Sequence, residues 1–229
     1  MSEILLLSFA ALLFMLTHLG ISSSPLRGML VNISSENVYL GIYSVISLAS
    51  LVWLIQLHDD MESTVILWQG GVATHAIPFV VMPLVVIFVG SGLLAKNPTA
   101  MKMEAAVEQE VTGILRVSRH PVQWGIFLWA TTHMIANGDL ASQIFFGCFA
   151  IVSGVGTLLL DRKCARRDGD KWTPFVEKTS NVPFLAIMNG RNQLKLGEIG
   201  WLSIVISLVL FAVLILFHDF FAGVALYAA

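Results

Sequence analysis

Six long stretches of this 229-residue chain contain no charged side chain, and they constrain its fold more than any other feature. They are largely apolar, contain no Asp, Glu, Lys or Arg, and cover residues 4–22, 38–57, 74–95, 121–136, 140–160 and 199–217. A helix of roughly 20 apolar residues crosses the hydrocarbon core of a bilayer, and most of the stretches reach that length. The fourth is shorter, and its helix is expected to tilt or to begin within Arg119-His120-Pro121. The sequence therefore predicts six transmembrane helices.

Composition excludes the main soluble classes of protein. Only 12% of the residues are charged and 56% are hydrophobic, whereas a soluble domain carries about 25% charged residues. An ordinary soluble enzyme, a disordered chain and a basic nucleic-acid-binding protein are therefore excluded. Because the apolar residues run continuously instead of alternating, the spans are not barrel strands. We expect an all-α integral membrane protein in which residues 1–229 form a single domain in contact with membrane lipid.

The positions of Lys and Arg predict how this six-helix transmembrane bundle is oriented. All 13 positive side chains lie in the loops after the first, third and fifth spans. They are Arg27, then Lys96, Lys102, Arg116 and Arg119, then Arg162, Lys163, Arg166, Arg167, Lys171, Lys178, Arg191 and Lys195. Loops rich in Lys and Arg remain on the cytoplasmic side. Both termini are therefore expected on the non-cytoplasmic side.

The two long loops are expected to lie on the membrane surface. The middle of loop 96–119 is compatible with a helix that has one solvated face. In loop 161–198, Trp172, Phe175 and Phe184 occur among Lys and Arg residues, a combination typical of the headgroup layer.

Histidines are the main candidates for chemistry, because no carboxylate lies within a predicted span. The chain has six: His18, His58, His75, His120, His133 and His218. Only His18 and His133 are clearly inside apolar spans, where an ionisable residue suggests function. Each is either a neutral imidazole bonded to a neighbouring helix or an axial ligand of haem iron. Catalytic zinc is disfavoured, since it needs three protein ligands and commonly a carboxylate.

Several motifs, in their order and spacing, resemble those of the NnrU family. They are HLGISSSPLRGMLV from His18, VYLGIYSVISL, Leu67-Trp68, GILRVSRHPVQWGIFLWATTHMIANGD, KTSNVPF, AIMNGR and EIGW. The resemblance covers nearly the whole chain. The sequence departs from the family after Leu67-Trp68, where Gln69-Gly70-Gly71 replaces expected prolines. Because prolines restrict the backbone, their absence affects the predicted shape of the loop before the third span and not the family resemblance.

The resemblance implies a membrane protein whose plant relatives bind haem b and isomerise a central polyene double bond. Their two proposed axial ligands match His18 and His133, and an alternative ligand used on a redox change matches His58. Bacterial members are associated with denitrification, namely nitrite and nitric oxide reduction. The implied location is the bacterial cytoplasmic (inner) membrane, and the implied substrate is an isoprenoid or carotenoid. Whether the chain is an enzyme stays open, and the resemblance identifies no catalytic residue.

Depth along the spans favours different histidine pairs. His18 lies about 8 Å past the middle of its span towards the cytoplasm, and His133 about 7 Å towards the other side. Axial ligands of one iron must lie at nearly the same depth. By this criterion His18 pairs with His120, and His133 pairs with His58. His120 is therefore kept as an alternative ligand beside the pair that the resemblance implies.

A more distant resemblance leaves a second function open. The run RHP-x-x-x-G, formed by residues 119–125, is similar to that of membrane phospholipid and isoprenylcysteine methyltransferases. In those enzymes the segment helps to form an S-adenosylmethionine site, which places Arg116 and Arg119 among the candidate residues here. Positive-inside anchoring is the simpler explanation for both arginines. A third possibility is a non-catalytic factor that assembles with components of a nitric oxide reductase.

Overall fold

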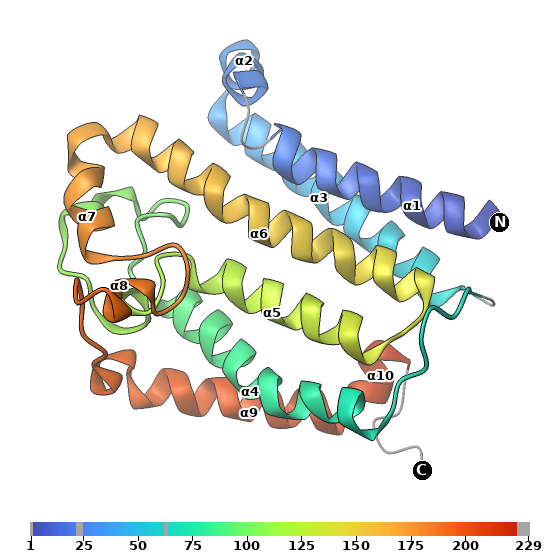
Figure 1. Ribbon diagram of the computed structural model, residues 1–229. Helices are drawn as coiled ribbons and strands as arrows, with labels where there is room; N and C mark the ends of the chain where they lie inside the picture. The colour runs from blue at the N-terminus through green and yellow to red at the C-terminus, as the bar shows by residue number, and fades with distance from the viewer. Residues whose placement is uncertain (1, 22–24, 62–63, 224–229) are drawn as a thin grey trace. The chain divides into compact units, whose positions relative to one another are not determined.

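The computed structural model describes residues 2–21, 25–61 and 64–223, and every regular element in these ranges is a helix (Figure 1). The longer helices are α1 (Ser2–Met15), α2 (Pro25–Ile33), α3 (Glu36–Asp59), α4 (Val72–Leu94), α5 (Pro121–Ala136), α6 (Leu140–Asp168) and α9 (Trp201–Leu216). Short helices are α7 (Trp172–Lys178), α8 (Leu185–Met188) and α10 (His218–Ala222). A π-helical turn, η1 (Leu16–Ile21), continues α1, and the 3₁₀ turns are η2 (Glu104–Glu108), η3 (Gly113–Arg116), η4 (Gly169–Lys171) and η5 (Leu196–Ile199).

Each of the six apolar stretches forms a helix, which confirms the all-α prediction. Among the described helices, four are long and apolar enough to cross a membrane: Glu3–Ile21, Glu36–Asp59, Val72–Leu94 and Leu140–Lys178. The apolar helix α9 is shorter, and α5 has 16 residues. Length and composition therefore make this a membrane protein with four candidate spans.

The chain forms two compact units. The first comprises residues 1–78 and 130–159, and the second comprises residues 79–129 and 160–229. In the first unit α1 packs along α3 (Figure 1). Leu7, Phe14 and Leu54 are buried there, whereas Leu5 and Leu48 are exposed. Apolar side chains on the outside are expected where lipid, and not water, is the solvent.

The loop between α3 and α4 is held against the turn between α5 and α6. The carbonyl oxygen of Gly138 accepts hydrogen bonds from the backbone nitrogens of Leu67 at 2.7 Å and Trp68 at 3.1 Å. A Cβ atom on Gly138 would lie 1.9 Å from the Trp68 carbonyl oxygen, so only glycine permits this approach.

Small residues bring the helices of the second unit close together. A Cβ atom on Gly125 of α5 would lie 3.2 Å from the Val85 carbonyl oxygen of α4. On another side of α4, the Ser91 and Ser203 hydroxyls lie 3.3 Å apart. Close backbone approach at small residues and hydroxyl pairing are typical of helix packing in membranes.

The two long loops of the second unit build an apolar core of their own. Trp172 and Phe175 are buried together with Val107, Val111 and Cys164. The expectation that Trp172 and Phe175 lie in the headgroup layer is therefore wrong, and only Phe184 is exposed. The helix expected in the middle of loop 96–119 is reduced to two 3₁₀ turns, because its apolar residues face this core.

We expect Gly138→Ala to destabilise the protein by about 2 kcal/mol, since the added methyl group displaces the Trp68 carbonyl. Gly156→Ala is the matched control, because a Cβ atom there meets nothing within 4 Å. Thermal denaturation in detergent, followed by circular dichroism, compares the two variants. Equal midpoints would contradict the close approach at Gly138.

Candidate functional site

Four phenylalanine rings of the first unit connect three histidines in one row. Phe14 lies on α1, and Phe145, Phe146 and Phe149 lie on α6. The ring centroids are 5.1 Å apart for Phe14 and Phe149, 5.2 Å for Phe149 and Phe145, and 5.0 Å for Phe145 and Phe146. Neighbouring centroids 4.5–7 Å apart lie in favourable aromatic contact. We call these rings, with His18, His58 and His133, the histidine–phenylalanine row.

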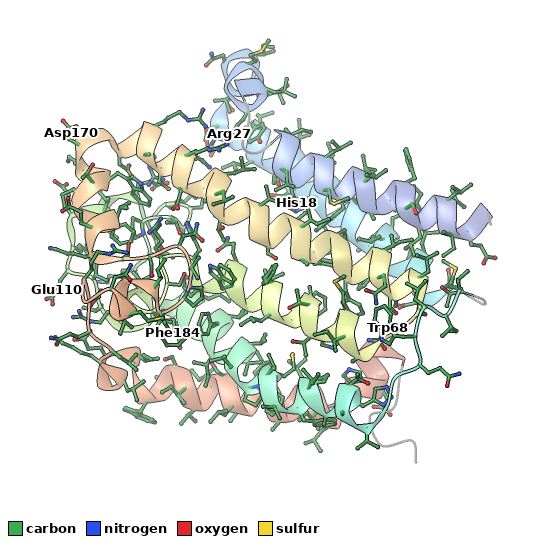
Figure 2. All side chains as sticks on the ribbon, viewed as in Figure 1. His18, Arg27, Trp68, Glu110, Asp170 and Phe184 are labelled. Carbon is green, nitrogen blue, oxygen red and sulfur yellow. The ribbon has the colours of Figure 1, made fainter. Side chains whose placement is uncertain are left out.

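His18 lies at one end of the row, in the π-helical turn η1 (Figure 2). Its ring centroid is 4.1 Å from that of Phe14. Nδ1 lies 2.8 Å from the Phe14 carbonyl oxygen, and Nε2 lies 3.0 Å from the Ser47 hydroxyl on α3. A carbonyl oxygen only accepts, so Nδ1 carries the proton and Nε2 accepts from Ser47. Both nitrogens of the neutral imidazole are therefore engaged.

His58 and His133 lie at the other end of the row. His58 of α3 stacks on Phe145, with centroids 4.4 Å apart, and His133 of α5 stacks on Phe146 at 4.9 Å. His58 also lies 6.2 Å from Phe146, so both imidazoles contact the same ring. The structure thus brings His58 and His133 together.

His18 and His133 contact different parts of this row. His18 bonds Ser47, which precedes His58 by 11 residues on α3, and such a separation spans about 16 Å along a helix. One iron needs both axial nitrogens on a single line through its centre. His18 contacts Phe14 and Ser47, whereas His133 contacts Phe146. The described residues contain no group of three or more His, Cys, Asp or Glu side chains able to hold a metal ion, whereas haem iron needs only two axial histidines.

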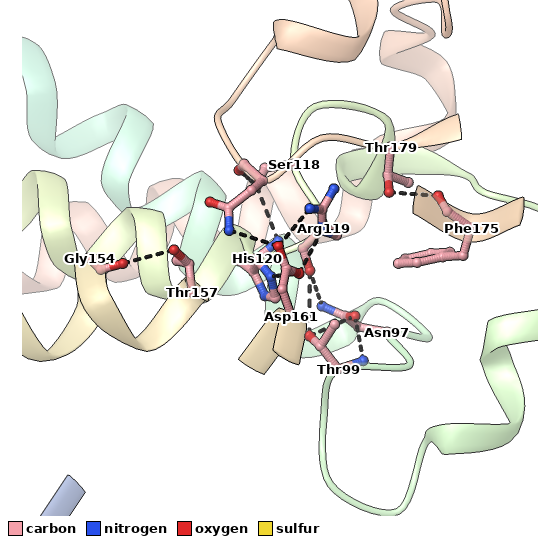
Figure 3. Close-up of polar contacts among 11 residues, drawn as sticks. Asn97, Thr99, Ser118, Arg119, His120, Gly154, Thr157, Asp161, Phe175 and Thr179 are labelled. Atoms are coloured by element: carbon pink, nitrogen blue, oxygen red, sulfur yellow. Dashed lines mark hydrogen bonds and ion pairs between the residues drawn. The ribbon is translucent and has the colours of Figure 1, made fainter. Parts of the chain in front are cut away.

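The second unit contains a polar cluster centred on Asp161, near the cytoplasmic end of α6 in the predicted topology (Figure 3). Arg119 donates from Nε and Nη2 to the two carboxylate oxygens at 2.7 and 2.6 Å. His120 Nε2 lies 2.7 Å from Oδ1, and Asn181 Nδ2 donates to Oδ2 at 3.1 Å. We call Arg119, His120, Asp161 and Asn181 the Asp161 cluster. It joins three segments that are more than 15 residues apart in the sequence.

His120 is fully buried in this cluster. Burial lowers the pKa of His120, against the opposing effect of its hydrogen bond to Asp161. The imidazole is therefore neutral, and its Nε2–H donates to the carboxylate that Arg119 holds as an anion. Among the described residues, Nδ1 has no hydrogen-bond partner.

Arg116, whose side chain is buried, forms a second ion pair with an exposed carboxylate. Its Nε and Nη2 atoms donate to Glu198 at 2.6 and 3.1 Å, and Nη1 donates to the Asn192 side-chain oxygen at 2.8 Å. Glu198 also accepts from the Gly113 backbone nitrogen at 3.1 Å. Arg116 and Arg119 thus neutralise carboxylates of the same chain.

Comparison of the sequence with known proteins identifies the family of this chain. A family model described as "NnrU protein" matches residues 6–226. The chain belongs to the NnrU family. It is similar to chloroplastic 15-cis-zeta-carotene isomerases, with 28% identity over 195 residues for Arabidopsis thaliana and 26% over 198 residues for Zea mays. Each match covers 80% of this chain, which spans about half the length of each relative. No solved structure matches.

Sequence reasoning missed both acidic residues of the NnrU-family chain that pair with its buried arginines. Asp161 immediately follows a charge-free stretch, and Glu198 immediately precedes one. A carboxylate at the edge of a span, next to a long loop that carries many arginines, is the signal that identifies such a pair. The arginine partners, 42 and 82 residues away, follow only from the tertiary fold.

We expect Asp161→Asn to destabilise the protein by about 3 kcal/mol, because it leaves the buried Arg119 charge without its carboxylate. Glu177→Gln removes one negative charge from an exposed position and is the matched control. Denaturation midpoints in detergent measure both. An Asp161→Asn chain as stable as the control would show that the cluster contributes nothing to stability.

The ion pair of Glu198 predicts a specific pH dependence. Arg116 lowers the pKa of Glu198 from its ordinary 4.5 to about 2. A depressed carboxyl pKa stabilises the fold above the ordinary pKa, and this stabilisation is lost as the pH falls towards 2. Wild type is therefore expected to exceed Glu198→Gln in denaturation midpoint at pH 6. The difference shrinks steadily below pH 4.5, and a difference independent of pH would contradict the pairing.

Proposed function

We propose that this NnrU-family chain is an integral membrane isomerase that acts on a cis double bond of a carotenoid-like polyene. The supporting observation is similarity across 80% of the chain to two proteins named 15-cis-zeta-carotene isomerase. The apolar helices favour a substrate that is itself dissolved in the membrane. The histidine–phenylalanine row is the proposed reaction site.

The row offers chemistry that suits a linear polyene. A conjugated chain presents flat, polarisable faces, and phenylalanine rings contact such faces by stacking and edge-on packing. Phe145 and Phe146 are buried, and their rings are nearly perpendicular, with an interplanar angle of 87°. His58 and His133 stack on these rings. In this proposal the phenylalanines orient the polyene and exclude water, and the histidines face its central bonds.

The proposed topology has six spans with both termini on the non-cytoplasmic side of a bacterial cytoplasmic membrane. Its support is that each charge-free stretch forms a helix and that every Lys and Arg lies in an odd-numbered loop. In this topology the Asp161 cluster lies at the cytoplasmic surface. The His58–His133 end of the row lies towards the opposite side.

Haem b binding is proposed separately, because the histidines allow two pairings. The resemblance implies His18 with His133, whereas the observed arrangement favours His58 with His133, which contact the same Phe146 ring. A bound haem would supply a redox-active iron next to the polyene. Either pair would hold the iron through two neutral imidazole nitrogens.

A haem spectrum tests the cofactor and distinguishes the two pairings. We expect protein purified in detergent to show a Soret band, and split α and β bands on reduction. His133→Ala is expected to abolish them, His58→Ala to change them, and His18→Ala to leave them nearly unchanged. His218→Ala is the control. Loss of the bands in His18→Ala but not in His58→Ala would support the pair implied by the resemblance, and a wild type without bands would exclude haem.

Conversion of 15-cis-zeta-carotene in proteoliposomes, followed by chromatography, tests the isomerase. We expect Phe146→Ala to lower the rate about tenfold, equivalent to about 1.4 kcal/mol in activation free energy. Phe9→Ala is the matched control, because Phe9 is exposed on α1. Wild-type protein without activity, but copurifying with subunits of a nitric oxide reductase, would contradict the isomerase and favour the accessory role in denitrification.

A further inference from the structure

The loop between α3 and α4 exposes four consecutive apolar side chains. Val65, Ile66, Leu67 and Trp68 are each between 40% and 60% exposed. Trp68 is labelled on this loop in Figure 2. Scattered exposed apolar residues are ordinary, but a contiguous group indicates a surface that binds something apolar.

The backbone of this loop is hydrogen-bonded to its own unit. Leu67 and Trp68 donate to the Gly138 carbonyl, and Val65 accepts from the Leu140 nitrogen at 2.8 Å. Thr64 accepts from the Ala141 nitrogen through its hydroxyl at 3.0 Å. Non-helical backbone at membrane depth is costly unless its polar groups are satisfied within the protein. This loop meets that condition while its apolar side chains face outward.

The position of the loop in the chain indicates the apolar phase that it contacts. It connects two candidate membrane spans, since α3 ends at Asp59 and α4 begins at Val72. No charged residue occurs from Thr64 to Ala95, so the exposed surface continues without charge into α4. Val72, at the start of α4, is 90% exposed. Trp68 suits a membrane boundary, because tryptophan is enriched at the headgroup level.

We infer that the side chains of Val65 to Trp68 insert into the bilayer at the boundary between headgroups and acyl chains. The insertion anchors the turn after α5, and through it the end of α5 that carries His133. Lipid is the occupant, because a surface without charge that continues into a membrane span matches the lipid boundary. This inference does not depend on the isomerase proposal, and it also explains how a loop without the expected prolines is held in place.

Spin labelling of the full chain in vesicles of phosphatidylcholine and phosphatidylglycerol tests the inference. The label is placed at Ile66→Cys, with unsubstituted protein as the blank for the two buried native cysteines. Leu48→Cys, exposed on α3, is the lipid reference, and Glu110→Cys, exposed on a long loop, is the water reference. Collision rates with oxygen, which dissolves in lipid, and with a water-soluble nickel chelate are measured at each position.

We expect the oxygen-to-nickel collision ratio at Ile66 to be several-fold above that at Glu110 and to approach that at Leu48. A ratio equal to that at Glu110 would overturn the inference, because the loop would then lie in water. Protection from both reagents would also overturn it, because a second copy or another protein would then cover the loop.

A charge placed in the loop gives an independent test. With the label at Val65→Cys, Ile66→Lys is expected to lower the ratio at least twofold by drawing the loop towards water. Gln69→Lys is the matched control and leaves the ratio nearly unchanged. Equal ratios in the two variants would contradict insertion of Ile66. If Ile66→Lys prevents folding, the measurement at Ile66→Cys still decides the question.

Discussion

The absence of water along the apolar stretches is the constraint on which the rest of the structure depends. Backbone groups in lipid must find partners within the protein, and a helix provides them within one segment. Side-chain hydroxyls follow the same requirement. Ser153 donates to the Phe149 carbonyl at 2.6 Å, and Thr157 donates to the Gly154 carbonyl at 2.8 Å. His18 uses both nitrogens in the same way. These polar atoms inside the apolar helices are therefore hydrogen-bonded within the protein, and the bonds stabilise the fold.

The same constraint explains why the charged residues gather in the long loops. Arg119 and Arg116 lie close to the ends of predicted spans, where an unpaired guanidinium would be partly dehydrated. Each has a carboxylate partner from a distant segment, Asp161 and Glu198 respectively. Both arginines are buried, so loss of either carboxylate leaves a buried charge without its partner, and the pairs therefore specify one arrangement of the loops. Around them, Trp172 and Phe175 complete a core that needs no lipid.

The sequence predicted those features that depend on local pattern. Charge-free stretches predicted the helices. The pairing of His133 with His58 that follows from depth along the spans stays a prediction. Local sequence patterns could not predict the Asp161 cluster. Its members are residues 119, 120, 161 and 181, which only the tertiary fold brings together. The burial of Trp172 was missed for the same reason. Aromatic residues among Lys and Arg occur both at membrane surfaces and around small cores, and only the partners distinguish the two.

Helix α6 contributes residues to both the histidine–phenylalanine row and the Asp161 cluster. Helix α6 carries Phe145, Phe146 and Phe149 near its beginning and Asp161 further along. Phe149 and Asp161 are 12 residues apart, which corresponds to about 18 Å along a helix. The two residues belong to different compact units. In the proposed function the apolar rings contact a membrane-dissolved substrate, whereas Asp161 holds the long loops of the second unit together. A role for His120 in the polyene chemistry is accordingly disfavoured, since its Nε2 is committed to Asp161.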